Sequence, residues 1–427
     1  MKRKLLSLLM LLMTAVTGAW AQGPWDSGDC TVTLSGGVMT VSGTGAMEDY
    51  GDVDDQPWKD YRTSITSVVV GSGVTSIGDL AFEDCTNLAS VTFASDSQLS
   101  NIGLCAFQNS GLTTIEIPAK VTTIGMSAFT ECSSLATVTF ATGSLLETID
   151  VAAFYQCTNL TSVTLPDGLT TIGITAFSEC TNLPSITIPA SVTSIGMNAF
   201  DNCTSLATVT LNGNPFIDDF AFLNVSATVT MNLTANSAGG AYWMTFYNKN
   251  YSFTADGSTT IYKAAVNSGN TAVVLTEVDD IPANNAAVLK SSNEVITMTL
   301  ASSTNGDYTG NELQGAASAT VAAAGDNVYC LSNETTREGG LTPRGVGFYT
   351  YTGTIPVNRA YLVISDGPTS ARGFLGIDDD DNTTAIDAPK ALSAEADGTL
   401  YDLSGRRVMG QPQKGIYVKN GKKFVIK

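Results

Sequence analysis

The sequence has no histidine among its 427 residues. Histidine is the commonest general base, and Ser/His or Cys/His nucleophile pairs and most catalytic zinc sites depend on it. Carboxylate chemistry of the glycosidase kind and Ser/Lys chemistry remain open. Basic residues are also scarce, since 21 Lys and Arg stand against 40 Asp and Glu, a formal net charge of −19. We therefore expect no nucleic-acid partner, because phosphate binding requires clustered Lys and Arg.

No apolar run is long enough to cross a bilayer, which takes about 20 helical residues. The run from Leu5 to Val16 follows Lys2, Arg3 and Lys4, and Ala19-Trp20-Ala21 comes after it. This order is typical of a secretory signal peptide with a small-x-small cleavage site. We interpret residues 1–21 as a signal peptide and expect an exported protein at the cell surface or outer membrane, or a secreted one.

An internal repeat fills the middle of the chain. Ala-Phe pairs recur at spacings of 25, 22, 25, 23, 23 and 22 residues, and an isoleucine stands five residues before each phenylalanine. The phenylalanines are Phe82, Phe107, Phe129, Phe154, Phe177, Phe200 and Phe222. The isoleucines are Ile77, Ile102, Ile124, Ile149, Ile172, Ile195 and Ile217.

A second block, L-x-x-[VI]-x-[FIL], lies between successive Ala-Phe pairs. Its last two apolar positions alternate like one face of a short strand. The copies are Leu88, Val91, Phe93; Leu112, Ile115, Ile117; Leu135, Val138, Phe140; Leu160, Val163, Leu165; Leu183, Ile186, Ile188; and Leu206, Val209, Leu211. A unit of this length and composition is the signature of a leucine-rich repeat.

One such unit cannot bury its own apolar face, so the repeats must stack, with each turn covering the next. We predict a mainly β protein with a leucine-rich-repeat solenoid of about seven turns. The solenoid is expected at residues 71–231, after an N-terminal β cap at 22–70.

The segments "SIGDLAFEDCTNLASVTF", "TIGMSAFTECSSLATVTF" and "TIGITAFSECTNLPSITIP" resemble the BspA-like class of bacterial leucine-rich repeats. The resemblance covers about residues 60–231. The preceding "LSGGVMTVSGTGAMEDY" and "PWKDYRTSITSVVVGSGVTSIG" are similar to the strands that open such proteins. The resemblance implies a surface protein used in adhesion to host matrix or to other cells, and it names no ligand.

Five of the eight cysteines lie three residues after a repeat phenylalanine: Cys85, Cys132, Cys157, Cys180 and Cys203. Export favours disulfides. However, equivalent side chains in stacked turns have parallel Cα–Cβ vectors, which keep their Cβ atoms beyond the usual separation of about 3.8 Å. We therefore predict a buried ladder of free thiols. Cys30, Cys105 and Cys330 match no metal-ligand spacing, and we expect no metal or cofactor.

The outward position of each repeat strand is mostly threonine. These residues are Thr92, Glu116, Thr139, Thr164, Thr187 and Thr210. Threonine suits strands through its branched side chain, so the stripe has a purely structural interpretation. The functional interpretation is a flat, weakly polar surface that binds an extended partner. Because it lacks Trp, Tyr and Arg, its affinity would come from loops or avidity.

The repeat decays after Phe222, and the segments that follow have their own character. Residues 232–253 contain an aromatic cluster that we interpret as a C-terminal cap, with a sugar platform as the alternative: Tyr242, Trp243, Phe246, Tyr247, Tyr251 and Phe253. Short β-rich runs over 254–376 predict a β-sandwich-like domain. The run Asp378 to Asp381 fails the EF-hand pattern, so 377–390 is expected to be an acidic linker.

Residues 391–427 reverse the charge balance, with seven Lys or Arg against three acids. Asn420-Gly421 predicts a two-residue hairpin turn. The pieces "YDLSGRRV" and "KGIYVKNGKK" and the terminal lysine resemble C-terminal sorting domains of type IX secretion. The resemblance implies that this short β-domain engages secretion machinery. An ordinary terminal β-domain is the alternative.

Three functions compete at this stage. The first is an exported cell-surface protein whose solenoid serves adhesion, through a host matrix or cell-surface protein or a glycan. The second is a passive surface spacer without a specific ligand. The third is a polysaccharide-active enzyme with a carboxylate pair, which we disfavour because shallow solenoid clefts lack the enclosure that catalysis prefers. We expect no enzyme activity and name no catalytic residue.

Overall fold

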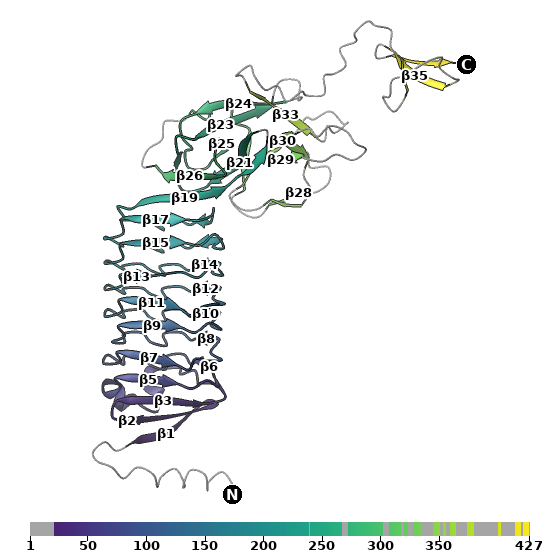
Figure 1. Cartoon of the computed structure of the whole chain (residues 1–427). Helices are drawn as coiled ribbons and strands as arrows, with labels where there is room; N and C mark the ends of the chain where they lie inside the picture. Colours follow the sequence, from purple (N-terminus) through teal and green to yellow (C-terminus); the bar gives the residue numbers. More distant parts are fainter. Residues whose placement is uncertain are drawn as a thin grey trace.

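The computed structural model is a tall stack of β turns that ends in a broader β domain (Figure 1). It describes residues 21–301 apart from 239 and 267–271, and then 307–316, 320–322, 328–334, 345–350, 353–355, 359–363, 374–379, 400–402, 415–419 and 422–426. The predicted signal peptide lies outside the described residues except for Ala21. The mainly β fold and the solenoid of about seven turns are confirmed.

An antiparallel sheet closes the lower end of the stack. It consists of β1 (Gln22–Ser27), β2 (Cys30–Ser35) and β3 (Val38–Gly43), and it continues in parallel into β5 (Ser67–Val70). Between β3 and β5 lie β4 (Gly45–Ala46) and the short 3-10 helices η2 (Val53–Asp55) and η3 (Lys59–Ser64). Trp58 is fully buried here, and its indole N–H donates to the Ala81 carbonyl at 3.0 Å. The cap therefore covers the first repeat turn.

Seven strands form one side of the stack, namely the six that the repeat predicts and β19, which it does not predict. They are β7 (Ser90–Phe93), β9 (Thr114–Ile117), β11 (Thr137–Phe140), β13 (Ser162–Val163), β15 (Ser185–Ile188), β17 (Thr208–Leu211) and β19 (Thr228–Thr234). Where neighbours pair, they are parallel and in register, as Val138 is with Ile115. The alternation of apolar and outward positions is confirmed.

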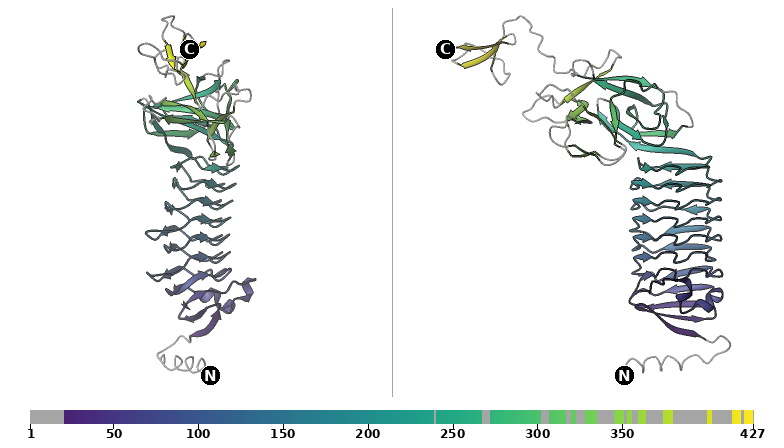
Figure 2. Two further views of the ribbon diagram at one scale, coloured as in Figure 1. Left: turned by 90° about the vertical axis from the view of Figure 1, so that its right-hand side faces the viewer. Right: turned by 180° about the vertical axis from the view of Figure 1, so that it is seen from behind.

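A second ladder of strands forms the opposite side, which is the right-hand side of the stack in Figure 1 and faces the viewer in the left panel of Figure 2. Its members are β6 (Val74–Ile77), β8 (Asn101–Ile102), β10 (Thr123–Ile124), β12 (Thr148–Ile149), β14 (Thr171–Ile172), β16 (Ser194–Ile195) and β18 (Phe216–Ile217). Together with β4 they make an eight-stranded sheet, and each ends on one of the repeat isoleucines. Sequence reasoning assigned one strand to each repeat because a two-residue strand is too short to show alternation.

The repeat phenylalanines form a continuous stack through the core. Successive ring centroids from Phe82 to Phe222 lie 5.2 to 5.5 Å apart with interplanar angles of 2 to 11°. Trp58 extends the stack below Phe82 at 6.2 Å, and Tyr251 closes it beyond Phe222 at 6.2 Å. Aromatic contacts at such distances stabilise beyond simple area burial.

Two residues of every turn have left-handed backbone conformation. One set precedes the Ala-Phe pair: Leu80, Cys105, Ser127, Ala152, Thr175, Asn198 and Phe220. The other follows it: Asp84, Asn109, Glu131, Gln156, Glu179, Asn202 and Asn224. Such a conformation is uncommon for residues other than glycine. It turns the backbone between them toward the next turn, so that the N–H of Phe107 donates to the Ala128 carbonyl at 2.8 Å.

The predicted burial of the cysteine ladder is confirmed. Four of the thiols also donate to the carbonyl of the phenylalanine in the preceding turn, at 3.1 to 3.3 Å: Cys132, Cys157, Cys180 and Cys203. Ser110, which replaces cysteine in the second turn, places its Oγ 3.2 Å from the Cys132 Sγ. This position is therefore occupied by a small side chain that can donate a weak hydrogen bond.

The solenoid passes directly into the next domain. Strand β19 pairs in parallel with β17 and antiparallel with β26 (Val295–Leu300), which pairs with β22 (Phe253–Ala255). A ten-stranded sheet contains β20 (Asn236–Ala238), β21 (Ala241–Asn248), β25 (Asn285–Ser291), β23 (Thr259–Val266), β24 (Ala272–Val278), β33 (Phe374–Asp379), β30 (Gly345–Thr350), β29 (Val328–Glu334), β32 (Ala360–Val363) and β27 (Leu313–Gly315). β28 (Thr320–Ala322) pairs with β31 (Gly353–Ile355). The sandwich arrangement itself stays a prediction.

The aromatic cluster predicted as one cap serves two cores. Tyr251, Phe246 and Phe253 pack with the solenoid core, whereas Trp243 and Tyr247 belong to a second core in the following sheet. The division follows from the alternation of side chains along β21.

The acidic linker begins later than predicted. Residues 377–379 form the end of β33, where Asp378 lies opposite Val274 of β24. The linker prediction was wrong for these three residues, because a charge run carries no sign of the neighbouring strand that supplies their backbone partners. Residues 380–390 lie outside the described residues.

The last described strands form a separate three-stranded sheet. They are β34 (Leu400–Asp402), β35 (Gly415–Lys419) and β36 (Lys422–Ile426). Lys419 lies opposite Lys422 across the antiparallel pair, the register that the predicted two-residue turn requires.

Replacing Phe154 by alanine should lower the free energy of unfolding by about 3 to 5 kcal/mol, because a fully buried ring with two stacked neighbours is lost. Chemical denaturation measures the change. Thr139→Ala, at an exposed position of the adjacent strand, is the control and should stay within about 0.5 kcal/mol. Equal effects of the two substitutions would contradict the stacked core.

The thiol ladder should be unreactive in the folded protein and free after unfolding. Burial raises the pKa of Cys85 to about 12 and that of Cys132 to about 11, so the reactive thiolate is scarce at pH 8. Titration of denatured, unreduced protein should detect at least five thiols, and native protein at most the three outside the ladder. Two or fewer thiols after denaturation would reject the ladder of free thiols.

Candidate functional site

The six predicted ligand-face residues lie on the outward side of the long strands. Thr92, Glu116, Thr139, Thr164 and Thr187 are exposed, whereas Thr210 is half-buried. The register places Thr139 beside Glu116 and Thr210 beside Thr187. The same column continues onto Thr230 of β19 and Val69 of β5, two positions that the repeat pattern did not include. Within each set of paired strands, the predicted residues therefore lie in a column.

This face is not a continuous sheet. Strand β7 pairs with β5, and β9 pairs with β11, but β7 and β9 form no ladder with each other. The same interruption separates β13 from β15, because β13 pairs only with β11 and β15 only with β17. The threonine column is thus broken between Thr92 and Glu116 and again between Thr164 and Thr187.

Backbone N–H groups just before and just after each strand normally anchor it to the preceding turn. For β11 these are the N–H groups of Ala136 and Ala141, which donate to Thr113 and Ile117 at 2.9 and 3.0 Å. For β17 they are those of Ala207 and Asn212, which donate at 2.9 Å each. Strands with both anchors pair over four residues.

Prolines remove these anchors where the sheet opens. Pro184 and Pro189 occupy both anchor positions of β15, and proline has no N–H to donate. Pro118 removes the second anchor of β9, and Pro166 that of β13, whose ladder with β11 is shortened to two residue pairs. Proline is tolerated in sheets chiefly at edges and strand ends. Both openings have proline at an anchor position, but β13 remains paired despite Pro166, so the loss of one anchor does not by itself open the sheet.

The turn after β7 is longer than the turn that follows it. Ile102 lies nine residues after Phe93, whereas Ile124 lies seven residues after Ile117. The same difference recurs after β11, where Ile149 lies nine residues after Phe140 and Ile172 lies seven after Leu165, yet β11 and β13 pair. Turn length therefore does not by itself decide where the sheet opens.

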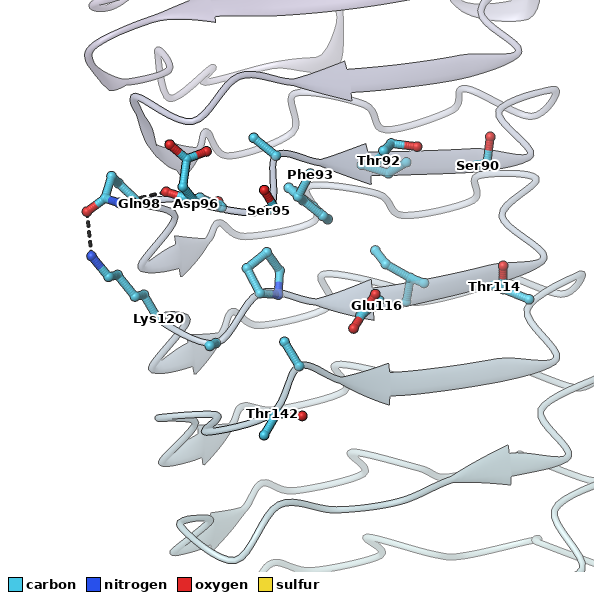
Figure 3. Close-up of a pocket in the computed structure, with 17 residues that line it drawn as sticks. Ser90, Thr92, Phe93, Ser95, Asp96, Gln98, Thr114, Glu116, Lys120 and Thr142 are labelled. Atoms are coloured by element: carbon cyan, nitrogen blue, oxygen red, sulfur yellow. Dashed lines mark hydrogen bonds between the residues drawn. The ribbon is translucent and has the colours of Figure 1, made fainter.

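The larger opening forms a hollow of about 840 Å³ (Figure 3). Its floor and walls include Thr92 and Phe93 of β7 and Glu116 of β9. Asp96 lies on the turn that follows β7. Across the gap, the Lys120 ammonium donates to the side-chain carbonyl of Gln98. Most of the other lining residues are small or carry hydroxyl groups.

The smaller opening forms a second hollow of about 410 Å³ between β13 and β15. Thr164, Thr187 and Pro189 line it, and Asp167 is its one charged side chain. Four of the six predicted face residues therefore border a hollow, and the predicted surface is less flat than expected.

A column of exposed apolar side chains occupies a different edge of the stack. Leu104, Met126, Ile174 and Met197 are 39 to 45 % exposed, and each directly follows the repeat glycine. The turns of Leu104 and Met126 are adjacent, since the Cys105 N–H donates to the Met126 carbonyl at 2.9 Å, and so are those of Ile174 and Met197, while the turn that carries Val151 lies between the two pairs. The sequence analysis missed this column, although an apolar residue recurring after I-G is its signal.

No three His, Cys, Asp or Glu side chains within the described ranges are grouped as metal ligands. In the same part of the chain, no helix is both long and apolar enough to span a bilayer.

Comparison with known proteins agrees with this geometry. Residues 60–149 and 147–263 match the BspA-type leucine-rich repeat region in six copies. The solenoid is thus similar to BspA-type leucine-rich repeats. No curated protein sequence matches the chain.

Solved structures of bacterial leucine-rich-repeat proteins are similar to parts of the chain. A leucine-rich repeat protein from Eubacterium ventriosum is 24 % identical, with 50 % of this chain and 79 % of that one covered and a TM-score of 0.25. The pneumococcal vaccine antigen PcpA is 20 % identical over 49 % and 69 %, with a TM-score of 0.30. A leucine rich cell surface protein from Faecalibacterium prausnitzii is 24 % identical over 47 % and 72 %, with a TM-score of 0.27.

Proposed function

We propose that this protein is exported and displayed at the bacterial cell surface, where its leucine-rich-repeat solenoid binds a host matrix or cell-surface protein, or a glycan. The observation that carries the proposal is the outward column of side chains, opened at two places into hollows of about 840 and 410 Å³. A purely supporting stack has no need of such openings, because closed turns bury more surface and make more backbone hydrogen bonds.

The two ends of the chain support export. Residues 1–21 have the pattern of a signal peptide, and residues 391–427 resemble a type IX sorting domain. The described part of the latter is a small three-stranded sheet, the kind of compact terminal module that secretion machinery can recognise.

Two other functions account for fewer of the structural features described above. A passive spacer accounts for the phenylalanine stack but not for the interrupted sheet. A polysaccharide-active enzyme would use paired carboxylates, and the larger hollow contains Asp96 and Glu116. That hollow is an open depression in a strand face, whereas catalysis favours enclosed sites that exclude water.

Removal of residues 401–427 should abolish display on the producing cell and leave the protein inside the outer membrane, because the sorting strands are lost. Protease accessibility on intact cells measures the display. The matched control carries Phe424→Tyr in the full chain, a conservative change that should leave display intact. Unchanged surface exposure of the truncated chain would reject the sorting role.

Purified protein should bind at least one member of an array of matrix proteins and glycans, and Thr139→Arg with Thr164→Arg should weaken that binding at least tenfold by placing bulky charges on the column. Glu131→Arg, at an exposed position off the column, is the control. A full array without any binding would favour the passive spacer, and product release from a polysaccharide would favour the enzyme.

A further inference from the structure

The larger hollow exposes apolar side chains that most other turns cover. All four residues of β7 and the first three of β9 line it. Val91 of β7 is half-buried, whereas its counterparts in the next two turns, Ile115 and Val138, are buried. Phe93, at the end of β7, is half-buried as well. The hollow therefore offers a small apolar patch beside the backbone of two strands.

The gap between these strands is too narrow for a third strand. Some Cα atoms of β7 and β9 lie within 8 Å of each other, and directly before the strands the Thr113 N–H donates to the Ala89 carbonyl at 3.2 Å. An inserted strand would need about 9.6 Å, twice the usual strand spacing. It follows that an extended peptide cannot pair with both edges.

The gap does suit single hydroxyl groups. In the described structure, β7 and β9 form no ladder with each other, so backbone donors and acceptors along their facing edges are left without strand partners. One hydroxyl oxygen can accept from a donor and donate to an acceptor that lie about 5.6 Å apart, the length of two ordinary hydrogen bonds. Water fits such a place, and so does a ligand rich in hydroxyl groups that displaces it.

Polar side chains surround the apolar patch. Asp96 and Gln98 lie on the turn after β7, Glu116 on β9 and Lys120 on the turn after it (Figure 3). A volume of about 840 Å³ lies within the range of small-ligand sites, about 300 to 1,000 Å³, which combine apolar surface with a few polar groups. A sugar matches this combination, because its C–H groups pack on apolar atoms while its hydroxyls both donate and accept.

The charges at the hollow select against anionic sugars. Asp96 and Glu116 are exposed, and neither carboxylate forms an ion pair or a hydrogen bond with the part of the chain that the structure describes. Both can accept from hydroxyl donors. Lys120, the one cation in the lining, already donates to Gln98. The formal net charge of −19 adds a field that repels sulfate and uronate groups.

We propose that the hollow between β7 and β9 binds an uncharged oligosaccharide. The sugar packs on Val91 and Phe93, its hydroxyls bridge the unpaired strand edges, and others donate to Asp96 and Glu116. This inference rests on the proposed surface-binding function and deepens it, because it assigns a glycan to one site on the strand face.

The test uses the full chain and saturation-transfer-difference NMR, which detects weak sugar binding. The probes are cellotriose, mannotriose, chitotriose and N-acetyllactosamine, with oligosaccharides of heparin and hyaluronan as anionic comparisons. At least one uncharged sugar should bind saturably, and the anionic ones at least tenfold more weakly. With the bound sugar present, hydrogen exchange should slow at residues 114–117 and stay unchanged at 208–211, a paired strand away from both hollows.

Variants of the protein locate the site. Thr92→Lys places a long side chain over the hollow, where it can pair with Glu116, and should weaken sugar binding at least tenfold. Thr230→Lys, the same change on β19 and outside the lining of both hollows, is its control. Glu116→Ala should weaken binding at least fivefold, whereas Glu131→Ala leaves it unchanged. Thermal unfolding confirms that each variant is folded.

Three results would overturn the inference: no saturable binding of any uncharged probe to the folded wild-type chain, equal binding of the heparin oligosaccharide, or unaltered binding by folded Thr92→Lys. If the sugars fail while a matrix protein binds in the array, the surface-binding function stands and only this site assignment falls. If nothing in the array binds either, the proposed function itself fails.

Discussion

Each turn of this solenoid packs against the next, so the facing surfaces of successive turns must have complementary shapes. The requirement is most exacting at the phenylalanine stack, where rings 5.2 to 5.5 Å apart follow one another from Phe82 to Phe222. The alanine beside each ring is fully buried, because a larger side chain would push neighbouring turns apart. The thiol below the ring is small for the same reason. The most regular positions of the repeat are therefore those where two turns meet.

Stacking also places identical residues about 4.8 Å apart, which penalises like charges in successive turns. The chain meets this problem at the second left-handed position of each turn, where carboxylates alternate with amides. The Asn109 amide donates to Asp84 at 2.8 Å, and the Gln156 amide donates to Glu179 at 2.7 Å. On the strand face, like charges are avoided because most of the outward positions carry the neutral side chain of threonine. A strongly acidic protein can thus be built from a repeat without a column of repelling charges.

We expect binding sites where successive turns do not fit against each other. Pro118, Pro184 and Pro189 remove backbone donors beside the two openings of the sheet. The openings carry the unpaired strand edges and the unpartnered carboxylates. The regular turns between them hold the two openings at a defined separation along one face. A repeat architecture can in this way carry distinct sites without a change of fold.

Several features could be predicted from the sequence because they depend on local periodicity. The Ala-Phe spacing predicted the number of turns and the alternating block predicted the long strands. The absence of histidine and the acidic charge balance limited the function classes to be expected. Other features depend on neighbours that are distant in the chain. A two-residue strand such as β10 exists only because adjacent turns supply its partners, and Asp378 is a strand residue only because β24 lies beside it. The six predicted face residues lie on the outward side of the long strands, but which of them border a hollow depends on hydrogen bonds between turns about 23 residues apart. The sequence alone thus determined the repeating unit, whereas the tertiary structure decided where successive units fail to join, because that depends on pairs of turns and not on any single one.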